Sequence, residues 1–304
     1  MVSCYGSFFT DKRGWWSADS QTVYFVDENR GGTEIKIVKC DLAEQSASTM
    51  FSETSETFVK TAHTSEDLNL LLPLTATDEL VWFSERTGWG HLYLYDMQTG
   101  QQKSVVTAGD WVVREVLHFD ADERELLIQT SGRHKNISPY YSDICKVNVD
   151  SGSITEISAG DYEHVIYKRR SVSAVVMGVR DMMGYDVNGV HGVSPDGRYV
   201  VATRSRVDIA PESILYRTDG EQEMVIELAD AHGLYDGWVW PEPIKMNAVD
   251  GETDIYGSIF YPPNFSSDQS YPVIDHAHGG SSFCSMPVGS FCNSPVFGAT
   301  FTLC

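Results

Sequence analysis

Residues 80–95 read LVWFSERTGWGHLYLY, and this stretch decides the fold. An apolar run at 80–83 leads into a polar segment with two glycines, and a second run at 91–95 alternates leucine with tyrosine. Alternation with a period of two, rich in aromatic residues and interrupted by glycine, indicates two strands joined by a tight turn. The stretch therefore predicts a β-hairpin.

The same unit recurs along the N-terminal three quarters of the chain. Residues 22–26 and 34–38 are apolar, alternating runs on either side of a polar turn at 27–32. Several strands are also preceded by turns in which Asp accepts backbone hydrogen bonds and Pro or Gly supplies the required φ. These entry turns are at 17–20, 120–123 and 194–197.

Turn–strand units of this kind are typical of four-stranded β-propeller blades, which take about 40–50 residues each. The copies are unevenly spaced, so the sequence predicts four to five blades. A stack of sheets in a β-sandwich is the alternative. We expect a mainly β chain with a partial β-propeller over residues 1–240.

The pattern changes after residue 240. Residues 244–251 and 253–260 read as a hairpin with an Asp-Gly turn. After a polar loop, residues 271–275 predict a short core strand that runs into a His-Gly-Gly turn at 278–280. Residues 241–304 therefore predict the beginning of a second domain.

Charge and composition exclude some partners. The formal net charge is −21, from 22 Lys and Arg against 43 Asp and Glu, which argues against nucleic acid or an anionic membrane as partner. No run approaches the roughly 18 apolar residues of a transmembrane helix. The first residues lack the basic and apolar regions of a signal peptide. Either the protein is intracellular, with a cytoplasmic location slightly favoured, or its true N-terminus lies upstream.

The six cysteines are scattered, without a CxxC pair. This argues against structural zinc and against a disulfide framework. Cys284 and Cys292 are close enough in sequence to pair, although free thiols are the expectation. We expect no cofactor and no bound metal.

Several motifs together resemble the prolyl oligopeptidase family of serine peptidases, and in particular its dipeptidyl peptidase IV-like branch. The resemblance spans most of residues 13–290. Its propeller part lies in 15–31 and 84–93. Its junction part lies in Asp250-Gly251, Tyr256-Gly257, 261–265, 271–274 and Gly279-Gly280.

The resemblance implies that an α/β-hydrolase domain, of which this chain holds the first strands, follows the propeller. It also implies a peptide substrate and leaves a homo-oligomer open. In the family a tyrosine before the Gly-Gly turn donates to the oxyanion. Here that position is His278, so we expect His278 or the backbone N–H of Gly279 to fill this role.

The family's nucleophile is missing from these 304 residues. The Gly-x-Ser triplets at 192–194 and 280–282 lack the second glycine of the Gly-x-Ser-x-Gly elbow. The family's order of Ser, Asp and His would place the whole triad beyond Cys304. We therefore expect a truncated chain that does not turn over peptides by itself.

Two functions remain open at this stage. The first is a fragment of a serine-type peptidase that cuts short peptides, with release of dipeptides after proline as a further expectation. The dipeptidyl branch uses a Glu-Glu pair to hold the substrate amino group, and no such pair occurs in these 304 residues. Either the pair lies upstream of this sequence, or the protein is not a dipeptidyl peptidase. The alternative is a non-catalytic β-propeller that binds a peptide or protein.

Three further clusters have simpler interpretations than a site. His276 and His278 would share one face of a strand beside Asp275, but no third metal ligand stands at a useful spacing. The carboxylates at 120, 122, 123 and 125 predict a solvated turn. Five aromatic residues are expected to pack in blade cores rather than line a ligand site: Trp82, Trp89, Tyr93, Tyr95 and Trp111.

Overall fold

A computed structural model describes residues 14–61, 70–158, 160–166, 192–221, 223–231 and 238–274. The described residues form strands β1 to β18, and no helix occurs among them. The described residues therefore include no helix that is long and apolar enough to cross a membrane. The expectation of a mainly β chain is confirmed.

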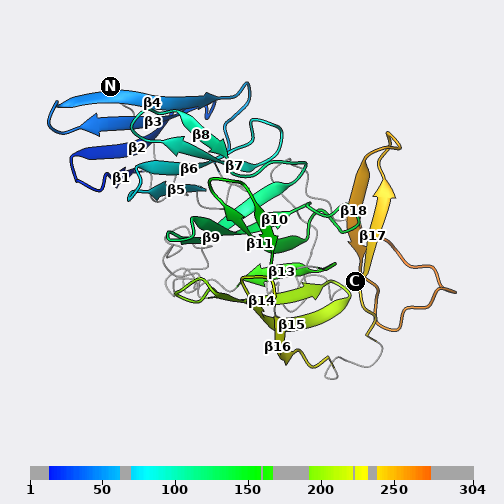
Figure 1. Cartoon of the computed structure of the whole chain (residues 1–304). Helices are drawn as coiled ribbons and strands as arrows, with labels where there is room; N and C mark the ends of the chain where they lie inside the picture. Colours follow the sequence, from blue (N-terminus) through cyan, green and yellow to red (C-terminus); the bar gives the residue numbers. More distant parts are fainter. Residues whose placement is uncertain are drawn as a thin grey trace, which may run out of the picture. The chain divides into compact units, whose positions relative to one another are not determined.

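Sixteen of the strands form four antiparallel four-stranded sheets, and in each sheet neighbours in space are neighbours in sequence (Figure 1). This simple up-and-down order is that of propeller blades. The predicted partial β-propeller is therefore confirmed, with four blades in the described residues.

The first sheet contains β1 (Gly14–Trp16), β2 (Thr22–Glu28), β3 (Glu34–Asp41) and β4 (Ser46–Thr54). The second contains β5 (Leu71–Leu74), β6 (Glu79–Ser84), β7 (His91–Asp96) and β8 (Gln102–Val105). The third contains β9 (Val112–Asp120), β10 (Glu125–Ser131), β11 (Ser142–Asn148) and β12 (Ile154–Glu156). The fourth contains β13 (Glu163–Ile166), β14 (Tyr199–Arg206), β15 (Ile209–Arg217) and β16 (Glu223–Leu228).

The entry turns of the first and fourth sheets have the same hydrogen bonds. In each, a serine hydroxyl donates to the aspartate two residues later and accepts from the N–H five residues later. These bonds measure 2.6 and 3.0 Å at Ser17, and 2.7 and 2.9 Å at Ser194. The accepted N–H belongs to the first residue of β2 or β14, so the turn sets where the second strand of the blade begins.

Strand β6 contributes to two hydrophobic cores because its side chains alternate between the faces of the sheet. Leu80 and Trp82 pack with residues of the first sheet, whereas Val81 and Phe83 pack with residues of the third. All four are at most 1% exposed, and burying each such side chain stabilises the fold by roughly 1.5–3 kcal/mol. A strand that is buried on both faces explains the continuous apolar run at 80–83.

The chain divides into two compact units. One comprises Met1–Arg133, Cys145–Thr155 and Lys168–His191, and the other comprises His134–Ile144, Glu156–Tyr167 and Gly192–Cys304. Both cores around β6 lie in the first unit. The second unit holds the fourth sheet and a two-stranded hairpin, β17 (Glu242–Asn247) and β18 (Asp254–Ile259).

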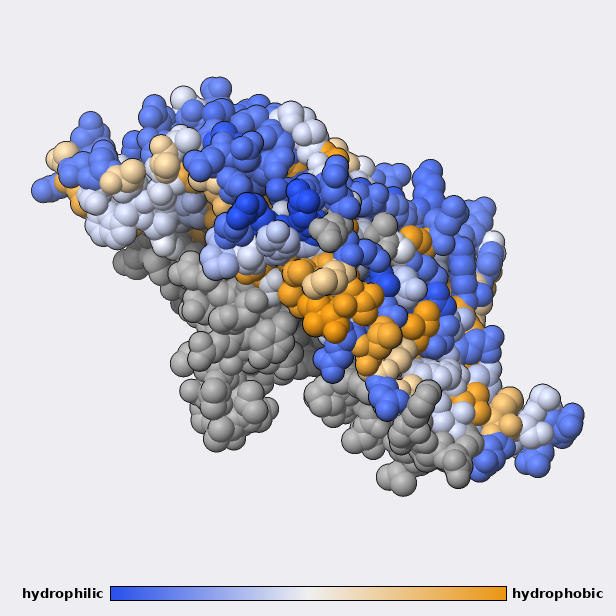
Figure 2. Space-filling model, turned by 60° about the horizontal axis from the view of Figure 1, so that its bottom comes forward, coloured by the Kyte–Doolittle hydropathy of each residue, from blue (hydrophilic) through white to orange (hydrophobic). Residues whose placement is uncertain are grey.

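The edge strand β16 is exposed along its whole length. Met224, Val225, Ile226 and Leu228 are each about half exposed or more, and hydrophobic residues gather on the face that Figure 2 turns forward. An unpaired edge with apolar side chains is a surface that native proteins cover or protect.

The hairpin predicted at 244–260 is confirmed, with Asn247 paired to Asp254 at its turn end. The strand predicted at 271–275 is wrong over 271–274, which carry no strand, and residue 275 lies outside the described residues. Val273 is 91% exposed and Ile274 is 69% exposed, so this apolar segment is not in a core. A strand requires a partner for its N–H and C=O groups, and no described strand pairs with these residues.

We predict that the turn between β6 and β7 tolerates asparagine better than alanine at Gly88. The φ of Gly88 is 89°, and a Cβ there would meet no atom within 4 Å, so only backbone strain opposes a side chain. Gly88→Ala should lower the free energy of unfolding by about 1–2 kcal/mol, whereas Gly88→Asn should cost less because Asn enters the left-handed region more readily. Denaturant melts of the two variants check this, and equal losses would contradict it.

Candidate functional site

The hairpin that leads toward the predicted oxyanion turn has a well-bonded tip. The carboxylate of Asp250 accepts from the N–H groups of Glu252 and Thr253, each at 2.9 Å, and from the Thr253 hydroxyl. The Thr253 hydroxyl and these N–H groups lower the pKa of Asp250 to about 2. Gly251 follows with a φ of 74° and completes the predicted Asp-Gly turn.

After β18, three aromatic rings hold the loop that continues toward residue 275. Phe265 lies between Tyr261 and Tyr271, with ring centroids at 4.4 and 5.2 Å. The Tyr271 hydroxyl accepts from the N–H of Ser266 at 3.0 Å, and the Tyr261 hydroxyl donates to Glu242 at the start of β17. The bond from Tyr261 to Glu242 thus holds the loop against the start of the hairpin.

The predicted site residues themselves lie outside the described residues. His278 and Gly279 are among them, as are His276 and Asp275 of the alternative metal interpretation. Their roles therefore stay predictions. Of the cysteines, Cys40 and Cys145 are not in a disulfide, whereas Cys284 and Cys292 also fall outside the described part.

A hydroxyl–imidazole pair does occur at Thr107 and His91, and it was not predicted. The His91 Nδ1 lies 3.0 Å from the Thr107 hydroxyl, and its Nε2 lies 2.8 Å from the carbonyl oxygen of Gly109. A carbonyl only accepts, so Nε2 carries the proton and Nδ1 accepts from Thr107. Burial lowers the pKa of His91, which keeps the ring neutral.

This pair resembles a nucleophile and its base, but its environment assigns it a structural role. His91 is 1% exposed and Thr107 is 2% exposed, so a substrate carbonyl cannot approach the hydroxyl. The Thr107 oxygen also accepts from the N–H of Leu92 at 3.0 Å. The pair therefore ties the segment after β8 to the start of β7.

The segment at 84–93, which carries one of the motifs of the family resemblance, contributes to a polar cluster around Glu53 of β4. Its carboxylate accepts from the indole N–H of Trp82 at 2.9 Å, from the Ser84 hydroxyl, and from the Arg86 guanidinium at 2.9 Å. The guanidinium also stacks over the Tyr93 ring, 4.1 Å from its centroid. The segment thus fastens the second sheet to the first rather than forming an open site.

Of the five aromatic residues, four lie in blade cores as predicted. Trp82, Tyr93 and Tyr95 belong to one core and Trp111 to the other, whereas Trp89 is 41% exposed. The carboxylates at 122 and 123 are exposed, and the Asp120 side chain accepts both of their N–H groups. Both sets therefore serve the fold.

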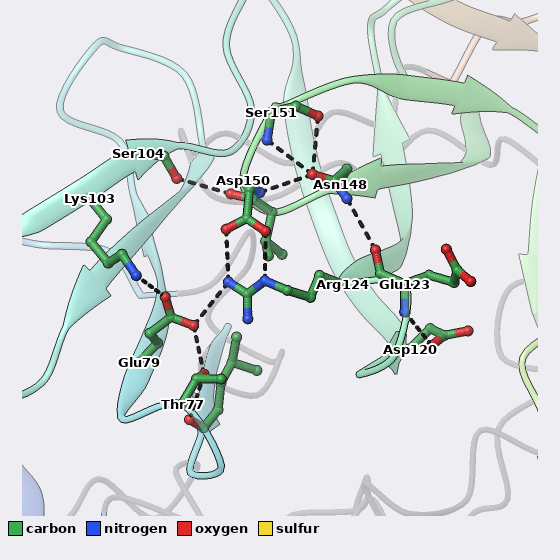
Figure 3. Close-up of polar contacts among 12 residues, drawn as sticks. Thr77, Glu79, Lys103, Ser104, Asp120, Glu123, Arg124, Asn148, Asp150 and Ser151 are labelled. Atoms are coloured by element: carbon green, nitrogen blue, oxygen red, sulfur yellow. Dashed lines mark hydrogen bonds and ion pairs between the residues drawn. The ribbon is translucent and has the colours of Figure 1, made fainter.

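A second polar cluster surrounds Glu79, which is 3% exposed (Figure 3). Its carboxylate contacts the Lys103 ammonium, the Thr77 hydroxyl at 2.6 Å and the Arg124 guanidinium at 2.9 Å. Arg124 in turn makes two bonds with Asp150, at 2.6 and 2.8 Å. Charge-assisted bonds of this kind are strong. The two-pronged Arg124–Asp150 bond lies within the third sheet, and the Arg124–Glu79 contact joins the third sheet to the second.

A model of the family described as the dipeptidyl peptidase IV (DPP IV) N-terminal region matches residues 12–178. The chain belongs to this family. The match covers more than half of the chain and includes the first three blades, so the resemblance to the dipeptidyl peptidase IV-like branch is confirmed.

Individual relatives of this dipeptidyl peptidase IV-type chain are distant. The "Probable dipeptidyl peptidase 4" of Aspergillus flavus is 24% identical over 269 residues, which are 87% of this chain and 31% of that protein. A crystal structure described as a dipeptidyl aminopeptidase IV from Bacteroides ovatus superposes with a TM-score of 0.67 at 20% identity, over 92% of this chain and 38% of that one.

Porphyromonas gingivalis dipeptidyl peptidase 4 has a TM-score of 0.60 at 16% identity, over 86% of this chain and 33% of that one. At these identities the two structures show a shared fold. The chain spans about a third of the length of these relatives.

Proposed function

We propose that this chain is part of a serine-type peptidase that hydrolyses short peptides and releases dipeptides after proline. The observation that carries the proposal is the family match over 12–178, in a chain whose four blades are followed by the hairpin β17–β18. Residues 1–240 would form the propeller part and residues 241–304 the beginning of the hydrolase domain.

In this proposal the blades restrict access to the hydrolase cleft, so that only short or unfolded peptides enter. The aromatic loop at 261–271 precedes, in sequence, the segment that carries His278 and Gly279. A donor at either residue would stabilise the negative charge that develops on the substrate carbonyl oxygen. A Gly-x-Ser-x-Gly elbow is absent from these 304 residues, so the acylating serine and its base would come from the rest of a longer protein.

Labelling with a fluorophosphonate probe tests this proposal, because such probes react covalently with an activated serine. We expect the 304-residue chain to remain unlabelled and the product of the natural gene, purified from its source, to be labelled. The labelled product should also release the dipeptide from a Gly-Pro-anilide. Prior treatment with unlabelled probe should abolish both signals.

An intact product of the natural gene that neither labels nor cleaves the anilide would overturn the peptidase. If that product still retained a peptide in a pull-down, the non-catalytic binding module would replace it. Labelling of the 304-residue chain itself would contradict the placement of the nucleophile outside these residues.

A further inference from the structure

Three side chains from separate segments meet on the second compact unit. His134 lies in the loop after β10, Asp143 lies on β11, and Glu156 ends β12. The His134 Nε2 is 3.0 Å from Asp143 Oδ2 and 2.7 Å from Glu156 Oε1. One nitrogen and one oxygen from each carboxylate thus lie within 4.8 Å of one another.

The charges of this cluster favour a cation. Two carboxylates contact the same imidazole nitrogen, and this nitrogen can donate only one proton. Like charges this close repel each other unless a positive charge lies between them, either on the imidazole or on a metal ion. A nitrogen with carboxylate oxygens is a common ligand set for zinc and other first-row divalent metals.

We propose that His134, Asp143 and Glu156 bind a divalent transition-metal ion, with zinc as the best fit. Bonds of about 2.0–2.2 Å to each ligand would place the ligand atoms roughly 3.3 Å apart in a tetrahedral site. The observed 2.7 and 3.0 Å require the ligands to separate by a few tenths of an ångström. His134 and Glu156 can make this adjustment because their side chains are 36% and 42% exposed.

The burial of the three ligands suits an ion with one open position. The Asp143 side chain is 11% exposed and provides a fixed ligand, whereas the two exposed ligands leave the fourth position to water. The ion would fasten the loop between β10 and β11 to the ends of β11 and β12. The same loop carries Tyr140, whose ring meets Tyr256 of β18 at 5.8 Å. The role that we propose for the ion is to fasten these segments, and it does not depend on the peptidase activity proposed above.

Calorimetric titration of the chelator-treated full chain with zinc chloride tests the site. We expect one binding event, accompanied by a rise in the thermal midpoint. His134→Ala should weaken binding by on the order of tenfold or more, since loss of even an outer group has that effect at metal sites. Glu156→Gln should also weaken it, and this exposed position keeps an acceptor for His134 and should not disturb folding.

Cobalt substitution gives a second readout, which contacts among the three side chains without a metal ion would not produce. Bound Co²⁺ should show a visible absorption band that is lost in His134→Ala. The matched control is His118→Ala on β9, which should change neither signal. Zinc affinity and cobalt spectrum equal in wild type and His134→Ala would overturn the site, as would a thermal midpoint that is unaffected by zinc. Either result would leave a hydrogen bond between the imidazole and a carboxylate.

Discussion

Arg124→Ala is expected to lower the free energy of unfolding by about 3–5 kcal/mol, the cost of breaking a buried ion pair from one side. The variant would leave the Glu79 carboxylate, 3% exposed, without its guanidinium partner, and Asp150 would lose both of its bonds to Arg124. Lys103 and Thr77 would remain as partners of Glu79, so folding should survive. Urea denaturation followed by tryptophan fluorescence measures the loss.

The matched control replaces both charges with apolar groups of similar size. Glu79→Met with Arg124→Met should be less destabilising than Arg124→Ala alone, because no carboxylate stays buried with only part of its partners. A double variant at least as unstable as the single one would show that the pair is net stabilising and that burial of the carboxylate is not the dominant cost.

The same cluster predicts a dependence of stability on pH. Burial raises the pKa of Glu79, but hydrogen bonds from Lys103, Thr77 and Arg124 outweigh it and hold the pKa below its ordinary value of 4.5. The contribution of Glu79 is therefore complete above pH 4.5 and is lost as the pH falls through the lowered folded-state value. Acid titration of the unfolding free energy should show a smaller loss over this range in Glu79→Gln than in wild type.

Glu53→Ala is expected to cost about 2–4 kcal/mol, the second largest effect. The carboxylate accepts from Trp82, Ser84 and Arg86, and the first two of these side chains are at most 1% exposed. Removing it leaves an indole N–H and a hydroxyl buried without their acceptor, and each such group costs about 1–3 kcal/mol. Arg86 is partly exposed and recovers much of its loss through water.

Glu53→Gln is the matched control, because its amide oxygen still accepts one bond while the charge is lost. It should cost clearly less than Glu53→Ala in the same denaturant melt. Trp82 fluorescence provides a local readout, since the indole would change its environment only in the alanine variant. If the two variants lose the same free energy, the charge on Glu53, rather than its hydrogen bonds, fastens the first two sheets.

Local patterns were sufficient to predict the blades. The alternation at 80–95 and the serine–aspartate turns at 17–20 and 194–197 act within a few residues, and the strands formed where the sequence predicted them. The hairpin with the Asp250-Gly251 turn was likewise predicted correctly from a local pattern. The apolar run at 271–274 was predicted wrongly as a strand, because hydrophobicity alone does not supply the neighbouring strand that a ladder requires.

The stretch at 80–95 by itself determined that this is a chain of antiparallel strands, and with the junction motifs it indicated the family. Only the tertiary structure decided that Glu53 would meet Arg86, that Glu79 would meet Arg124, and that His134 would face two carboxylates. These partners lie far apart in sequence or on different segments, so neither periodicity nor turn chemistry specifies them. The residues of different sheets meet because burial of both faces of β6 brings successive sheets together. His134, Asp143 and Glu156 meet because the turns of the third sheet bring these segments of one blade side by side.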